Sequence, residues 1–224
     1  MVKLLKLHNR LNITLLLVIM SVSSFLLSLF RVYLTGSSFL LFLNWNLFLA
    51  FIPWFFTSII ILKPNLQKKK PVLLGLLFLW ILFFPNALYI LTDLFHLRAS
   101  SLMPIWFDLI LILSFAWIGL LFGFISLIDI EKLLAGYLNT NIISIISIFL
   151  LFMASFGIYI GRYLRWNSWD IIASPFSLFY DISERIINPL EHFGTWGMTI
   201  LMGLLLNMFY WSFKMLKLDT HLVI

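Results

Sequence analysis

The stretch FFPNALYILTDLFHLR, residues 83–98, combines a hydrophobic segment with side chains that can do chemistry. Asp93 and His96 are three residues apart, so on a helix they share one face. A carboxylate beside an imidazole can orient the ring as a general base. The same two groups could hold a divalent metal if Asp108, or His192 and Glu191, completed the site. Two ligands are too few to predict a metal site, and a purely structural role, with Asp93 paired to an arginine, remains the alternative.

Other polar residues are expected at the same level. Asn86 and Tyr89 continue the helical face of Asp93 and His96, and Pro85 is expected to kink this helix. The predicted catalytic residues are Asp93, His96 and Asp108, and the predicted ligand-binding residues are Asn44, Asn46, Asn86, Tyr89, Arg98, Arg162, Arg165, Trp166, Trp169 and Asp170. The sequence identifies no cofactor.

The elements that must position these residues are membrane-spanning helices. The 224 residues are 62% hydrophobic and 11% charged, which excludes an ordinary soluble domain. A helix of about 20 apolar residues crosses a bilayer, and the long apolar runs favour helices over barrel strands. We predict an all-α integral membrane protein, one transmembrane domain over residues 1–224. Its six spans are expected at about 11–34 (an uncleaved first helix), 40–62, 71–91, 104–128, 142–163 and 195–213.

The positive charges predict the orientation of these spans. With the N-terminus inside, ten of the fifteen lysines and arginines fall on the inner side and five on the outer side, as the positive-inside rule requires. Both termini are then cytoplasmic. The net charge of +6 follows largely from this topology, so no nucleic-acid partner is predicted. All five positively charged residues on the outer side are arginines, whose planar guanidinium binds carboxylates and phosphates with paired hydrogen bonds.

The orientation also predicts where polar groups gather. Asn44, Asn46, Asn86 and Asp108 fall in the outer third of the bundle, whereas the inner two-thirds is expected to be nearly pure hydrocarbon. Between the last two spans, residues 176–190 are predicted to form an amphipathic helix that begins at Ser174-Pro175. This helix is either a simple interfacial cover or a mobile lid. The glycine pairs Gly119/Gly123 and Gly157/Gly161 predict close helix packing.

Three strings, PNALYILTDLFHL at 85–97, PIWFDL at 104–109 and GRYLRWNSWDI at 161–171, resemble the signatures of domain-of-unknown-function family 1361. The resemblance covers most of the chain, from the second span to the sixth. It implies a bacterial integral membrane protein, and it implies no activity. We expect this protein to lie in the plasma membrane.

Three function classes remain open at this stage. The first is an enzyme or binder acting on anionic lipid headgroups at the outer polar site, with Arg162 and Arg165 gripping the anion. The second is a non-catalytic partner of another membrane protein. The third is a transporter or channel component, which the lack of polar residues in the inner half disfavours. In every case the lipid bilayer is the expected partner.

Overall fold

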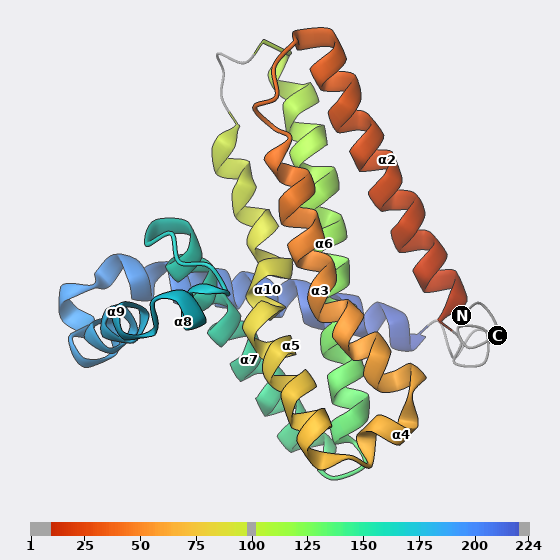
Figure 1. Cartoon of the computed structure of the whole chain (residues 1–224), viewed down its shortest axis with the longest axis vertical. Coiled ribbons are helices and arrows are strands. Elements are labelled where there is room, and N and C mark those ends of the chain that lie inside the picture. Colours follow the sequence, from red (N-terminus) through yellow and green to blue (C-terminus); the bar gives the residue numbers. More distant parts are fainter. Residues whose placement is uncertain (1–9, 98–101, 220–224) are drawn as a thin grey trace. The chain divides into compact units, whose positions relative to one another are not determined.

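The structure, a computed structural model, describes residues 10–97 and 102–219. The described residues form helices joined by short connections, and six of these helices are long and apolar enough to cross a membrane. The predicted all-α membrane fold is therefore confirmed. The chain divides into two compact units, residues 1–133 and 134–224 (Figure 1).

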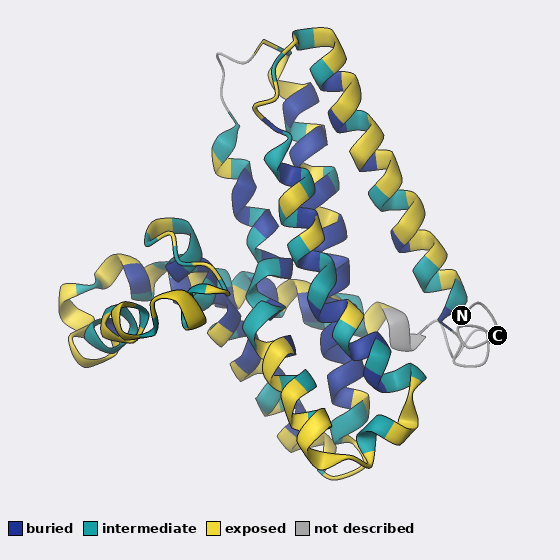
Figure 2. Ribbon diagram, viewed as in Figure 1, coloured by how far each residue is buried: buried dark blue, intermediate teal, exposed yellow. Residues whose placement is uncertain are grey.

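The first unit contains four long helices. These are α2 (Leu11–Thr35), α3 (Phe42–Leu62), α5 (Lys70–Tyr89) and α6 (Ile105–Leu134). A single turn, α4 (Pro64–Gln67), connects α3 to α5, and a 3-10 helix, η1 (Ile90–His96), continues α5. Residues of α6 bond to α2, α3 and α5, so α6 is the common partner of the other three. Figure 2 shows the corresponding difference in burial, with buried residues concentrated on α6 and exposed ones along α2.

Three polar contacts set the antiparallel register of α2 against α6. Arg31 pairs with Asp108, Ser24 donates to Ser114 at 3.0 Å, and Arg10 pairs with Asp129. The two arginines are 21 residues apart (31 minus 10), and so are the two aspartates (129 minus 108). At 1.5 Å per helical residue, the two ion pairs are about 32 Å apart along the helices. This spacing equals the thickness of a bilayer's hydrocarbon core, about 30 Å.

Three helices differ from their predicted extent by more than two residues. The last span, in the second unit, continues to Asp219, beyond the predicted end at residue 213. The fourth span continues to Leu134, beyond the predicted end at residue 128, because Asp129 is paired inside the bundle and does not end the helix. The third span is α-helical up to Tyr89 and then continues as the 3-10 helix η1 from Ile90 to His96. The expectation of one continuous α-helical face through Asn86, Tyr89, Asp93 and His96 is therefore wrong, since a 3-10 helix turns by about 120° per residue.

Close helix packing at two glycines is confirmed. A Cβ on Gly119 would lie 2.7 Å from the main-chain oxygen of Ala87, and one on Gly123 would lie 2.8 Å from a methyl carbon of Leu88. At Gly119, only glycine lets α6 approach the backbone of α5 this closely, and at Gly123 a larger residue would press on the Leu88 side chain.

The second unit holds the last two spans and the segment between them. The spans are α7 (Thr140–Tyr163) and α10 (Phe193–Asp219), and between them lie α8 (Asp170–Ala173), α9 (Pro175–Ile187) and η2 (Pro189–Glu191). The predicted amphipathic helix is confirmed as α9, which begins with Pro175 in its first turn after Ser174.

The orientation of the side chains on α9 is the reverse of that of a helix covering a water-soluble core. Phe176, Phe179 and Ile187 are 63–89% exposed, while Arg185 is buried. The polar face is therefore turned toward the unit and the apolar face away from it, as expected for a helix whose surroundings are lipid.

Candidate functional site

The 3-10 helix η1 holds the two central site residues, Asp93 and His96. Side chains at i and i+3 eclipse one another in a 3-10 helix, so the imidazole lies over the turn that carries the carboxylate. His96 Nδ1 is 3.9 Å from Asp93 Oδ1 and 3.3 Å from the Asp93 main-chain oxygen. Asp93 is fully buried, whereas the His96 side chain is 30% exposed. The imidazole is thus the accessible member of the pair and the carboxylate lies behind it.

Helix α3 fixes both members of this pair. Asn46 Nδ2 donates to Asp93 Oδ2 at 2.7 Å, which satisfies the carboxylate oxygen farther from the histidine. The His96 ring packs against Phe42, with 4.8 Å between ring centroids, and edge-on to Phe39. These aromatic contacts restrict the rotation of the imidazole.

A second polar network lies at the same end of the first unit. Asp108 accepts two hydrogen bonds from Arg31, Nε to Oδ1 at 2.7 Å and Nη2 to Oδ2 at 3.1 Å. One turn earlier on α2, Ser28 Oγ accepts a hydrogen bond from Asn44 Nδ2 at 3.1 Å. Asn44 and Asn46 are two residues apart on α3, so they face different partners.

Together the two networks form a polar band across α6, α2, α3 and η1. The structure thereby brings five of the predicted site residues to one end of the first unit: Asn44, Asn46, Asp93, His96 and Asp108. Asp108 is tied into the bidentate pair with Arg31. This bonding suits a structural role better than the predicted catalytic one. Asn86 and Tyr89 are half-buried on the last turn of α5, and Arg98 lies outside the described residues.

The remaining predicted residues belong to the second unit, where they organise the chain after α7. Trp166 Nε1 donates to Asp181 of α9 at 2.6 Å, and Asp170 accepts from the main-chain nitrogen of Asn167 at 2.7 Å. Arg165 adopts a left-handed backbone conformation with φ 62°, and it is exposed. Arg162 lies in the last turn of α7 and is half-buried, while Trp169 is exposed.

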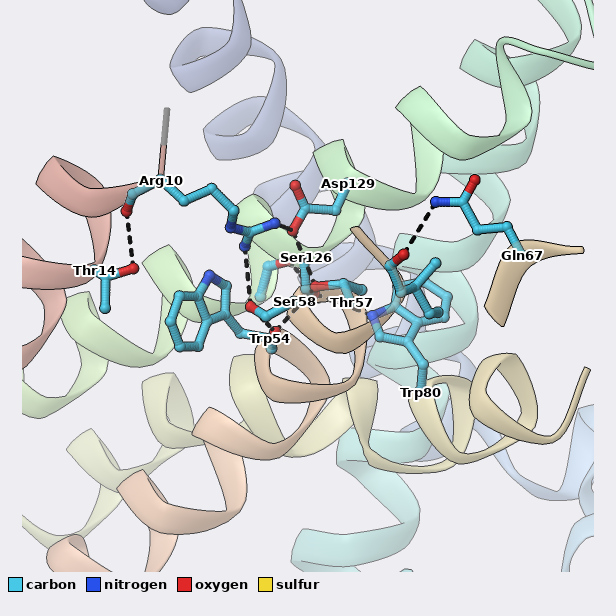
Figure 3. A network of polar contacts seen from close by, with 11 residues as sticks. Arg10, Thr14, Trp54, Thr57, Ser58, Gln67, Trp80, Ser126 and Asp129 are labelled. Carbon is cyan, nitrogen blue, oxygen red and sulfur yellow. Dashed lines mark hydrogen bonds and ion pairs between the residues drawn. The ribbon is translucent and has the colours of Figure 1, made fainter. Parts of the chain in front are cut away.

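A polar cluster at the opposite end of the first unit was not predicted. Arg10 donates to Asp129 Oδ2 at 2.7 Å and to Ser58 Oγ at 3.1 Å, and Thr57 Oγ1 donates to the same aspartate oxygen at 3.0 Å (Figure 3). Nearby, the buried Trp80 donates to Ser126. The expectation that this end is nearly pure hydrocarbon is therefore wrong. The lack of polar residues there can no longer be used as an argument against a transporter or channel. The sequence contained one signal of this cluster, because the two arginines and the two aspartates that pair are each separated by 21 residues.

The first unit also contains a cavity of about 470 Å³ between α2 and α3. Its lining residues are Thr14, Leu17, Val18, Ser21, Val22, Phe25, Asn44, Leu47, Phe48, Phe51, Trp54 and Phe122. Nine of these twelve are apolar and none is charged. Asn44 therefore borders both the polar band and the cavity.

The arrangement suits proton transfer better than metal binding. The main-chain oxygen of Asp93 can only accept, so the contact with His96 Nδ1 places the ring hydrogen on Nδ1 and leaves the lone pair on Nε2. A ring in this tautomer can take a proton at Nε2. Across residues 10–97 and 102–219, no three His, Cys, Asp or Glu side chains are grouped so as to hold a metal ion.

Comparisons with known proteins give one match. Among curated proteins and among solved structures no match was found. A family described as "Protein of unknown function (DUF1361)" matches residues 45–209, which include Asn46, η1, Asp108 and the segment around Trp166. This match covers well over half of the chain, and the chain therefore belongs to the DUF1361 family.

Proposed function

We propose that this protein is a membrane enzyme that acts on the headgroup of a lipid, with His96 as the proton acceptor. Asp93 orients the ring through its main-chain oxygen, and its carboxylate stabilises the imidazolium that forms. One observation carries the proposal: a fully buried carboxylate lies behind a partly exposed imidazole. Burying a carboxylate is costly, and the hydrogen bond from Asn46 offsets part of that cost. General bases of this kind contribute about 10²–10⁴-fold to a rate.

The level of the pair along the membrane normal favours a headgroup as the substrate. Asn46 connects Asp93 to α3 beside Asn44, and Asn44 bonds to Ser28, one turn from Arg31. The pair therefore lies near the Arg31–Asp108 end of a region about 32 Å long, where headgroups replace hydrocarbon. The positive-inside rule places this end outside, with both termini cytoplasmic in a bacterial plasma membrane.

That the headgroup is anionic is a separate proposal, and it is based on residues of the second unit. Arg162 and Arg165 stand at the end of α7 beside Trp166 and Trp169, residues typical of a membrane interface. Guanidinium groups there bind lipid phosphates with paired hydrogen bonds. Replacing both arginines by lysine keeps the charge and removes that geometry, so anionic lipids should bind less tightly to the variant while zwitterionic lipids are unaffected.

The test of the catalytic pair compares lipid headgroups in membranes that contain the wild type, His96→Gln or Asp93→Asn, by mass spectrometry. His192→Gln is the matched control, because His192 belongs to the second unit, where it lies 3.6 Å from Glu184, and has no part in the proposed catalytic pair. We expect the wild type and His192→Gln to change one headgroup class in the same way, and His96→Gln to lose the change by at least about 100-fold. If the wild-type protein leaves every lipid class unchanged, the proposal that it is a headgroup enzyme is refuted and a non-catalytic partner role is favoured. An active His96→Gln refutes the assigned base.

A further inference from the structure

We propose that the cavity between α2 and α3 binds an acyl chain of a membrane lipid. The proposal stands on the cavity itself and does not depend on catalysis at His96. With nine apolar lining residues and no charged one, the cavity suits neither an ion nor a charged solute. Its volume of about 470 Å³ lies within the range of small-molecule pockets, roughly 300–1,000 Å³.

The position of the cavity makes hydrocarbon the available occupant. The α2 residues that line it run from Thr14 to Phe25, between the two ion pairs formed by Arg10 and Arg31. Those pairs are separated by about the thickness of a hydrocarbon core. The cavity is thus expected at the depth of the lipid tails, where water is scarce.

The wall of the cavity is continuous with the lipid-facing side of α2. Val18, Val22 and Phe25 line the cavity and are also 45–53% exposed on the surface of the helix. A chain in the bilayer can therefore reach the cavity sideways, past α2. An apolar space of this kind is filled by whatever apolar groups border it, and lipid tails border this helix.

The ends of α2 explain why a flexible chain fits and a protein helix does not. Ion pairs fix both ends of α2 to α6. Near one end, the Arg10 guanidinium lies 5.5 Å above the ring of Trp54, which lines the cavity (Figure 3). Asn44, another lining residue, is bonded to Ser28 of α2. A helix about 10 Å wide would have to displace α2, whereas a single acyl chain needs no such movement.

The test uses a phospholipid that carries a photoreactive diazirine in the middle of one acyl chain. The full-length protein is placed in nanodiscs of phosphatidylglycerol, and in parallel of phosphatidylcholine, with the probe at low mole fraction. After illumination, cross-linked peptides are quantified by mass spectrometry. We expect labelling of the cavity wall at Val18–Phe25 and Leu47–Phe51 to exceed that of the exposed α10 residues Ile200 and Leu201 by at least fivefold, in both lipids.

Two variants of α2 form a matched pair. Ser21→Phe fills the cavity that Ser21 lines, whereas Ser23→Phe adds the same ring to the exposed side of the helix. Labelling of the wall should fall at least fivefold in Ser21→Phe and stay within twofold in Ser23→Phe. Phe51→Ala enlarges the cavity instead, and should keep the labelling if Ser21→Phe folds poorly. Uniform labelling of all exposed helices, or a wall signal that Ser21→Phe leaves unchanged in a folded protein, would overturn the proposal. Because this readout does not require turnover, an inactive His96→Gln that still labels separates the two proposals.

Discussion

Breaking the ion pair between Arg31 and Asp108 on one side should be among the most destabilising single changes in the first unit. Its two hydrogen bonds are 2.7 and 3.1 Å long, and the two side chains are only 3% and 5% exposed. Replacing Asp108 by leucine leaves a buried guanidinium without its counter-ion. The expected cost is about 3–5 kcal/mol of unfolding free energy, the usual result of removing one partner of a buried pair.

The double variant separates the pairing energy from the cost of desolvation. Arg31→Met should also cost about 3 kcal/mol or more, because the remaining carboxylate is then buried alone. Arg31→Met combined with Asp108→Leu removes both charges, and its stability should return to within about 1 kcal/mol of the wild type, since apolar replacement of a whole buried pair is often neutral. The coupling energy from this cycle, the cost of the double variant minus the sum of the singles, is then about 5 kcal/mol or more in magnitude.

The measurement is equilibrium unfolding in mixed detergent micelles, with the four proteins of the cycle compared under one condition. Asp170→Ala is the control, because Asp170 accepts a bond from an exposed main-chain nitrogen, and it should cost no more than about 1 kcal/mol. Single variants that each cost under about 1 kcal/mol would contradict the burial of the pair. A double variant as unstable as the sum of the singles would contradict the pairing itself.

Three further predictions concern packing, the second ion pair and topology. Gly119→Ala should cost about 1–3 kcal/mol of unfolding free energy, because its Cβ meets the Ala87 oxygen, while Gly75→Ala meets nothing within 4 Å and should be neutral or stabilising in the same assay. Thr57→Val should lower the unfolding free energy by only about 1 kcal/mol, since Asp129 keeps its bond to Arg10. A loss as large as that of Asp129→Ala would refute the claim that Arg10 is the main partner of Asp129. Cysteines at Ser38 and at Lys69 should react with a membrane-impermeant maleimide from opposite sides of the membrane, and labelling of both from outside would overturn the orientation.

Hydropathy predicted the spans well because the cost of exposing backbone polar groups to lipid leaves little choice but helices. It failed at Asp129, since a charge near the end of an apolar run is indistinguishable from a loop until its partner is known. The partner, Arg10, is 119 residues away in the chain. The change from α5 to η1 could not be predicted either, because the spacing of Tyr89, Asp93 and His96 is compatible with an α-helix.

The type of the candidate site was less predictable than its location. Polar residues of five helices were expected at one level, and in the first unit the structure joins two of these helices, α2 and α3, through Ser28, a residue with no obvious role in the sequence. Ser28 lies one turn from Arg31 and accepts a hydrogen bond from Asn44 of α3. It therefore links the end of α2 that carries the ion pair to α3, whose Asn46 bonds to Asp93. A small hydroxyl inside an apolar helix carries little signal, because serine can satisfy itself locally by bonding to the preceding turn, as Ser28 also does with Phe25.

The two proposals account for different depths of the same unit. The ion pairs of α2 define a length of about 32 Å, and the cavity occupies the depth between them, where tails lie. Asp93 and His96 belong to one end of that length, where headgroups lie. Asn44 touches both regions, since it lines the cavity and bonds within the polar band. A lipid bound with its chain in the cavity would therefore have its polar end at the level of His96 if it entered from that leaflet. In that case Ser21→Phe should weaken headgroup turnover through the Michaelis constant, with the turnover number retained, because the chain contributes binding and His96 contributes chemistry.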